Sequence, residues 1–272
     1  MTETPIEPVA TASPWAESPV AASAPDLQQA APKPASPVST VLWGLASTLA
    51  LAAWISWQTH SWVWGAAAVA GVFVHEFGHV LAINWAGSGP SRIRIIPFFG
   101  GAASMERPAA TELKGVLIAL AGPVFGLLAA LPFFGLAAAT GDRRWLTGAI
   151  VIAGFNLLNL APAPPLDGSK ALGPVLARIH PLLERAVLLL IGLAAVAWTV
   201  ADGSWLIALV IGLSIFASLR TAQLRPAARP LSWGEWGLSL GLCLISVLLC
   251  AGVLLAAAVA HANPQSLSGA AS

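Results

Sequence analysis

The sequence is organised as a series of long apolar segments separated by short polar connections. Segments of about 20 apolar residues are long enough to cross the hydrocarbon core of a bilayer as helices. Seven segments approach this length: 39–57, 62–86, 115–139, 146–162, 184–201, 204–220 and 236–261. The fifth and sixth are short and are separated only by Asp202-Gly203, so they form either one helical hairpin or a less regular pair. The pattern predicts an all-α polytopic membrane protein with about six to seven transmembrane helices.

The composition agrees with a membrane protein. Of the 272 residues, 57% are hydrophobic and only 9% are charged, whereas about 25% of the residues in soluble domains are charged. The mean hydropathy is +0.78. The net charge of +1 gives no reason to expect a nucleic-acid partner, which a basic surface would favour.

Residues 1–37 have a different composition from the rest of the chain. They are rich in Pro, Ala and Ser, and they lack the basic stretch followed by an apolar core that marks a signal peptide. A segment of this kind cannot bury enough apolar surface to fold. We therefore predict a disordered tail.

The basic residues predict the orientation. If all seven segments cross the membrane, eleven of the thirteen Lys and Arg residues fall on the side of the tail, and only Arg143 and Arg144 fall on the other side. Basic residues in short loops collect on the cytoplasmic side of a membrane. The N-terminus is therefore predicted to be cytoplasmic.

The second apolar segment contains the sequence His75-Glu76-Phe77-Gly78-His79, which has the pattern H-E-x-x-H. Two histidines four residues apart lie on the same face of a helix, one turn apart, so both imidazoles can reach one metal ion. Glu76 is placed to move a proton on a metal-bound water. Ionisable groups inside a membrane segment are costly, so the pattern indicates a functional site that binds zinc.

Catalytic zinc usually has three protein ligands, and the candidate for the third is Asp167. It follows the fourth apolar segment in the stretch 159–168, where three prolines in four positions end any regular helix. Irregular backbone at membrane depth is tolerated where it is buried in protein or lines a wet cavity. Considered alone, Asp167-Gly168 is better explained as a helix end with an ordinary turn; with the upstream histidines, a metal ligand becomes the better explanation.

Together, H75-E-F-G-H79 and N159-L-A-P-A-P-P-L-D-G168 resemble the two motifs of the site-2 protease family of intramembrane zinc metalloproteases. The Gly-Gly segment at 98–102 and Ala121-Gly122-Pro123 extend the resemblance. It covers residues 62–178, the predicted catalytic transmembrane core. The tail 1–37 and a first transmembrane helix at 38–61 precede this core, and accessory transmembrane helices at 179–272 follow it.

The resemblance implies a role for each matching residue. His75, His79 and Asp167 would bind one Zn²⁺, Glu76 would be the general base, and Asn159 would hold the substrate backbone or the oxyanion. The segment 92–105, with Gly100 and Gly101, would be a re-entrant β-hairpin whose edge binds an unfolded substrate strand. Asn156, one turn before Asn159, either lines the same cavity and contacts substrate or bridges helices by hydrogen bonding.

The sequence departs from the family pattern in two places. Ser169 replaces the second Gly that often follows Asp-Gly, and Gly126 stands where an Asn commonly follows Ala-Gly-Pro. The loops are too short for a PDZ domain, and no region after the last span could form a CBS domain. We therefore expect a compact member of the family.

The function implied by the resemblance is proteolysis of membrane-anchored proteins in a bacterial inner membrane. The partners would be the lipid bilayer and a transmembrane protein substrate, and homo-oligomer formation stays open. Two alternatives are a metal-ion transporter and a non-catalytic zinc-binding membrane protein. A transporter would place ligands on several spans, whereas here the candidate ligands converge on two motifs. The presence of Glu76 argues against a purely structural zinc site, because such a site needs no base.

Overall fold

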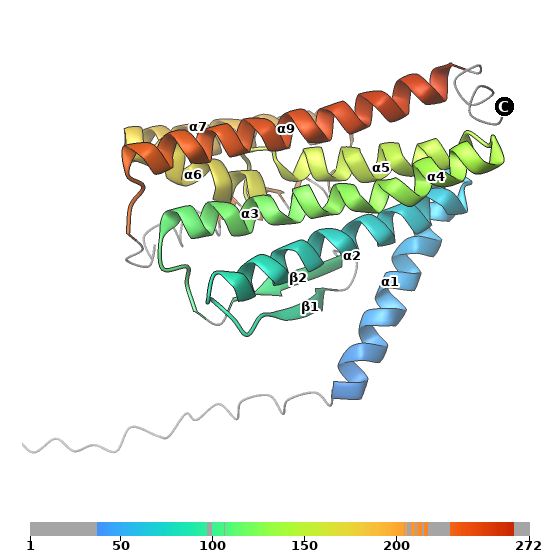
Figure 1. Ribbon diagram of the computed structural model, residues 1–272, viewed down its shortest axis with the longest axis horizontal. Coiled ribbons are helices and arrows are strands. Elements are labelled where there is room, and N and C mark those ends of the chain that lie inside the picture. The colour runs from blue at the N-terminus through green and yellow to red at the C-terminus, as the bar shows by residue number, and fades with distance from the viewer. Residues whose placement is uncertain are drawn as a thin grey trace, which may run out of the picture. The chain divides into compact units, whose positions relative to one another are not determined.

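The computed structural model describes residues 37–96, 100–105, 107–203, 205, 208–209, 211–213, 215–216 and 229–263. The helices and strands are, in chain order, α1 (Pro37–Thr59), α2 (Trp62–Trp85), β1 (Arg92–Ile96), β2 (Gly100–Ser104), α3 (Glu112–Gly126), the 3-10 helix η1 (Leu127–Ala130), α4 (Leu131–Thr140), α5 (Arg144–Asn159), α6 (Asp167–Ile179), α7 (Pro181–Ala201) and α9 (Trp233–Ala262) (Figure 1). The predicted tail, apart from Pro37, and much of the predicted sixth span lie outside the described residues.

The structure is mostly helical, as predicted. Within the described residues, four helical segments are long and apolar enough to cross a membrane: Trp62–Trp85, Glu112–Thr140, Pro181–Ala201 and Trp233–Ala262. The total of six to seven spans stays a prediction. The predicted fourth span corresponds to α5, which has 16 residues. At 1.5 Å per residue it is about 24 Å long, less than the roughly 30 Å of a hydrocarbon core.

Capping residues define where two of the long helices begin. The hydroxyl of Thr111 accepts a hydrogen bond from the Lys114 N–H at the start of α3. At the start of α9, Ser232 and Glu235 form a capping box, in which each side chain accepts from the backbone N–H of the other residue. These contacts satisfy N–H groups that have no partner within the helix.

α2 packs against α1, α3 and α5, and α9 lies across α3, α5 and α6 (Figure 1). One core cluster joins α2 to η1, α4 and α5 and includes Ala67, Ala149 and Ile152. A second cluster joins α3, α6 and α9 and includes Val116 and Cys250. Many of these side chains are small, which lets helix backbones approach closely in a membrane protein.

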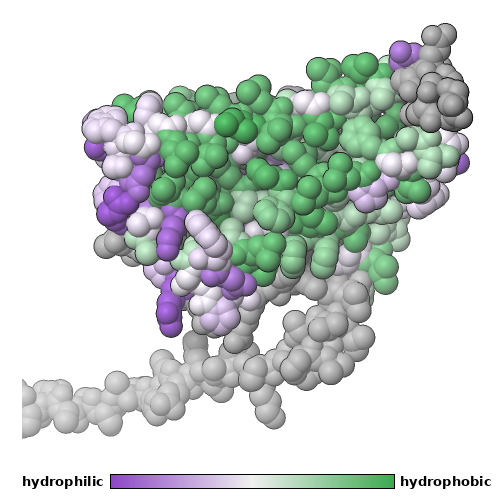
Figure 2. Space-filling model, viewed as in Figure 1, coloured by the Kyte–Doolittle hydropathy of each residue, from purple (hydrophilic) through white to green (hydrophobic). Residues whose placement is uncertain are grey.

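The outer face of the helices is strongly apolar. Figure 2 shows a broad hydrophobic band, with most of the hydrophilic residues at one end of it. Large apolar side chains are exposed on the described helices, such as Trp198 on α7 (72%) and Leu248 on α9 (69%). Exposed apolar area of this extent marks a surface that contacts lipid or another protein.

Several charged side chains lie near the ends of helices. Near the start of α9, Arg178 of α6 lies over the Trp233 ring, and the Arg229 guanidinium pairs with Glu235. At the far end of α9, Arg143 donates a hydrogen bond to the His261 carbonyl over 2.8 Å.

β1 and β2 form a two-stranded antiparallel sheet within the predicted segment 92–105. Arg92 pairs with Ser104 and Ile96 with Gly100, and residues 97–99 between the strands lie outside the described part of the chain. β2 lies against α2, the helix that carries the two candidate histidine ligands. A re-entrant position of this hairpin in a membrane stays a prediction.

Candidate metal centre

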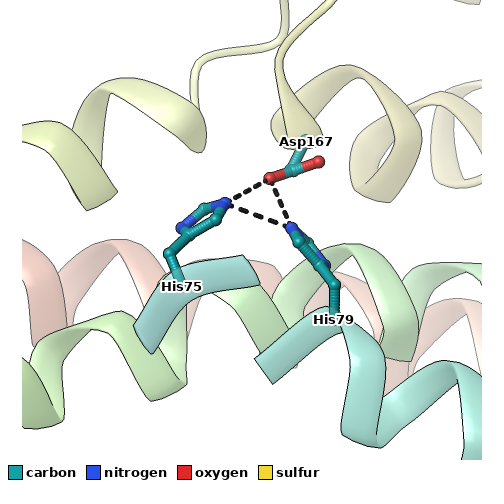
Figure 3. Close-up of side chains that lie close together, drawn as sticks. All are labelled: His75, His79 and Asp167. Carbon is teal, nitrogen blue, oxygen red and sulfur yellow. Dashed lines mark hydrogen bonds and ion pairs between the residues drawn. The ribbon is translucent and has the colours of Figure 1, made fainter. Parts of the chain in front are cut away.

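Three side chains from two separate segments converge on one point (Figure 3). His75 and His79 project from α2, and Asp167 is the first residue of α6. Asp167 Oδ2 lies 3.0 Å from the Nε2 atom of each histidine, and the two Nε2 atoms are 3.1 Å apart. All three residues are buried, with exposed fractions of 2%, 7% and 6% in chain order. The sequence prediction that these residues lie together therefore agrees with the structure.

The proline-rich turn between α5 and α6 delivers Asp167 to this point. α5 ends at Asn159, and α6 begins at Asp167 after the extended residue Leu166. A Cβ atom on Gly168 would lie 2.1 Å from the Leu160 carbonyl oxygen, so only glycine fits here without displacing the backbone. The end of the turn, next to Asp167, therefore packs against the start of the turn at Leu160.

Hydrogen bonds on the far side of each imidazole define its tautomer. His79 Nδ1 lies 2.8 Å from the Ile118 carbonyl oxygen, which only accepts, so Nδ1 carries the proton. Asn156 Nδ2 donates to the Ile152 carbonyl, which leaves Asn156 Oδ1 to accept from His75 Nδ1 over 2.9 Å. A neutral histidine protonated on Nδ1 presents a lone pair on Nε2. Both Nε2 lone pairs therefore face Asp167.

This donor set fits a zinc ion. When both histidines are neutral and protonated on Nδ1, two imidazole lone pairs and a carboxylate oxygen face one another, an arrangement that a cation stabilises. Ligand atoms in a tetrahedral site with bonds of about 2.0–2.1 Å lie roughly 3.3 Å apart, close to the 3.0–3.1 Å observed here. Two histidines and one carboxylate also form a common catalytic zinc set that leaves a fourth position open.

Lys170 influences the charge of the third ligand. Its Nζ atom lies 2.9 Å from Asp167 Oδ1, the oxygen that does not face the histidines. A positive charge this close to a carboxyl group favours its ionised form, which is the form that binds a metal.

Glycines let α3 approach the candidate ligands closely. A Cβ atom on Gly122 would lie 2.3 Å from His79 Nε2 and 2.8 Å from His75 Nε2. On α2, a Cβ atom on Gly78 would lie 2.6 Å from the Ala121 carbonyl oxygen. Both glycines belong to patterns that can be recognised in the sequence, H-E-x-G-H and Ala121-Gly122-Pro123. Neither pattern showed that Gly78 of α2 contacts α3 or that Gly122 of α3 contacts the histidines of α2.

The remaining predicted residues occupy different positions. Glu76 is half-buried and close enough for its charge to act on His79. Asn159 is the last residue of α5, and its Nδ2 donates to the Phe155 carbonyl over 3.0 Å. Gly100 and Gly101 lie in β2. Asn156 has an exposed fraction of 0% and lies behind His75, so the structure does not support a substrate contact for it.

Comparison with known proteins points to the same chemistry. Residues 46–162 match the family model described as Peptidase M50B-like, and this match includes both histidines. Two proteins from two strains of Mycobacterium tuberculosis, both named "Putative zinc metalloprotease Rip3", are each 32% identical to this chain over 190 residues. The alignment covers 61% of this chain and 47% of each relative, so the chain spans about half the length of these relatives.

Proposed function

We propose that this chain is an intramembrane zinc metalloprotease of the site-2 protease family, which hydrolyses peptide bonds of membrane-anchored proteins within or near the bilayer; the family-model match and the similarity to the two named zinc metalloproteases support this proposal. The observation that carries this proposal is the buried group of His75, His79 and Asp167, with Glu76 on the same helix. Helices with strongly apolar outer faces hold the group in place, which supports chemistry at membrane depth.

Zinc, when held by these three residues, lowers the pKa of a bound water to about 7 and polarises the scissile carbonyl. Glu76 takes the proton from the attacking water and returns it to the leaving amine. Its place on α2 next to His75 keeps the base at a fixed distance from the ligands, as general-base catalysis requires. The developing negative charge needs a donor, and we assign this role to Asn159, whose Nδ2 has a second N–H besides the one that it donates to the Phe155 carbonyl.

The substrate is a transmembrane or membrane-anchored protein. Helical hydrogen bonding hides the carbonyl groups of a substrate, so its helix has to unwind locally before cleavage. An extended strand can then pair with an edge of the β1–β2 sheet. Gly100 and Gly101 in β2 have no side chains that would keep such a strand away.

The proposed setting is a bacterial inner membrane, with the N-terminal tail in the cytoplasm. Most of the basic residues in the loops fall on the side of the tail when all seven predicted segments cross, which supports this orientation. Oligomer formation is a separate question that size-exclusion chromatography with light scattering answers.

The test compares the purified wild-type protein with Glu76→Gln in detergent, measuring bound zinc and cleavage of a transmembrane peptide. We expect about one zinc in both proteins and cleavage by the wild type alone, because the substitution removes a base and spares the ligands. Cleavage by the Gln variant at the wild-type rate would exclude Glu76 as the base. A wild-type protein that binds no zinc would refute the metalloprotease proposal.

A further inference from the structure

Asn156 is buried in α5 and uses both ends of its amide group. Its exposed fraction is 0%. Nδ2 donates to the Ile152 carbonyl of the same helix over 2.8 Å, and Oδ1 accepts from His75 Nδ1 over 2.9 Å. A buried amide is costly unless it is hydrogen-bonded, and the second of these bonds crosses from α5 to a candidate zinc ligand on α2.

The two histidines are held from two different helices. His79 Nδ1 donates to the backbone carbonyl of Ile118 in α3. His75 Nδ1 has no such contact with a backbone carbonyl among the described residues, and its partner is the side chain of Asn156. A side-chain substitution at position 118 would leave the backbone carbonyl that holds His79. The orientation of His75, in contrast, depends on the side chain at position 156.

Gly126 provides the space in which the Asn156 amide lies. A Cβ atom on Gly126 would be 2.1 Å from Asn156 Oδ1 and 2.7 Å from both Cγ and Nδ2. Any side chain at position 126 would therefore displace the amide from His75. Gly126 is also the position at which the sequence departs from the Asn that commonly follows Ala-Gly-Pro, so the amide in this space comes from α5 and not from α3.

We propose that Asn156 is a positioning residue for zinc binding: it holds His75 in the tautomer protonated on Nδ1 and directs Nε2 toward His79 and Asp167. This inference rests on the proposed zinc site. Partners of this kind fix ring orientation and raise the basicity of the ligand, and their loss typically weakens metal affinity by about 10- to 100-fold.

The alternative is that Asn156 only joins α5 to α2 and has no effect on the metal. Near-isosteric substitutions separate the two roles. Asn156→Leu keeps the branched shape of the side chain and removes the acceptor, whereas Asn156→Asp keeps an acceptor for His75 and removes the donor to Ile152. Ser239→Ala on α9 is the control for loss of a buried polar group, because Ser239 has an exposed fraction of 0% and lies outside the metal centre.

The experiment measures zinc dissociation constants of the full chain in detergent by competition with a chelator. We expect Asn156→Leu to bind zinc about 10- to 100-fold more weakly, and Asn156→Asp and Ser239→Ala to stay within about threefold of the wild type. Wild-type affinity in Asn156→Leu, or equal losses in the Leu and Asp variants, would overturn the positioning role.

A second measurement needs no variant and tests the same role. In the zinc-free wild-type protein with ¹⁵N-labelled histidine, NMR should show His75 protonated on Nδ1, and protonation on Nε2 would overturn the proposal. Failure of the proposed function is distinguishable from failure of this inference. If the protein binds zinc but cleaves no peptide, only the proposed protease function is contradicted. The positioning role of Asn156 is still tested, because the zinc dissociation constants of the variants are measured without catalysis.

Discussion

Replacing Gly122 with alanine tests the close approach of α3 to the metal centre. The added methyl carbon would lie 2.3 Å from His79 Nε2, 2.5 Å from His79 Cε1 and 2.8 Å from His75 Nε2, whereas ordinary contacts begin near 3.4 Å. Either α3 or the imidazoles must therefore move by about 1 Å. Metal–ligand distances vary by only about 0.2 Å in functional sites, so the ligands cannot absorb this shift while keeping their positions.

The expected size of the effect follows from the cost of overpacking. Inserting a methyl group into a packed site costs about 1–3 kcal/mol, and each 1.4 kcal/mol changes an equilibrium constant tenfold. If the strain falls on the ligands, zinc affinity drops roughly 5- to 150-fold. Chelator competition on the purified variant measures this change directly.

Gly115→Ala on the same helix is the matched control. Its methyl carbon would meet only Ala109 Cβ, at 4.0 Å. Alanine also favours a helix by up to about 1 kcal/mol over glycine, so we expect Gly115→Ala to keep wild-type zinc affinity and to unfold at the same or a higher temperature. Wild-type zinc affinity in Gly122→Ala would refute the reasoning about this contact.

Three further substitutions probe the turn and the third ligand. Asp167→Asn should weaken zinc binding strongly, since it removes the charged ligand, and unchanged zinc content would remove Asp167 from the ligand set. Gly168→Ala should lower both zinc affinity and the unfolding temperature, because its Cβ would lie 2.1 Å from the Leu160 carbonyl oxygen; a variant with wild-type values for both would contradict the close contact. Lys170→Gln should change zinc affinity by less than about fivefold, because the Lys170 side chain is 63% exposed and exposed ion pairs contribute about 0–1 kcal/mol; a larger loss in the same chelator assay would show that Lys170 holds the ligand more firmly than its exposure implies.

The local part of the site could be predicted from the sequence. His75 and His79 share one face of α2 because helix geometry alone places residues four apart one turn from each other. The end of α5 and the turn before Asp167 follow from the proline-rich stretch, since proline cannot continue a helix. Bringing Asp167 to the histidines is a tertiary contact, which was indicated by an acidic residue at the proline-rich break and by the second motif of the family.

The interactions behind the ligands depend on how the helices pack. The Ile118 carbonyl that accepts from His79 is a backbone group, so the residue type at position 118 does not predict this contact. For Asn156, the sequence allowed either a substrate contact or a helix bridge, and the structure has the bridge, since its acceptor lies on α2. The break within one predicted span could not be predicted either. The 3-10 helix η1 divides the predicted span 115–139. A hydropathy pattern does not distinguish a 3-10 turn from an α-helical turn, so the pattern contained no sign of this division.

The ligands and their supports come from four segments, which bears on how the site forms. α2 supplies both histidines, α6 supplies Asp167, α3 holds His79, and α5 holds His75 through Asn156. The two motifs form the site only when α3 and α5 pack against α2. Gly122 and Gly126 have no side chains, so α3 can lie close to the histidines and to Asn156. Zinc affinity therefore reports on the packing of the whole core. A substitution that separates α3 or α5 from α2 should weaken metal binding even when it leaves His75, His79 and Asp167 in place.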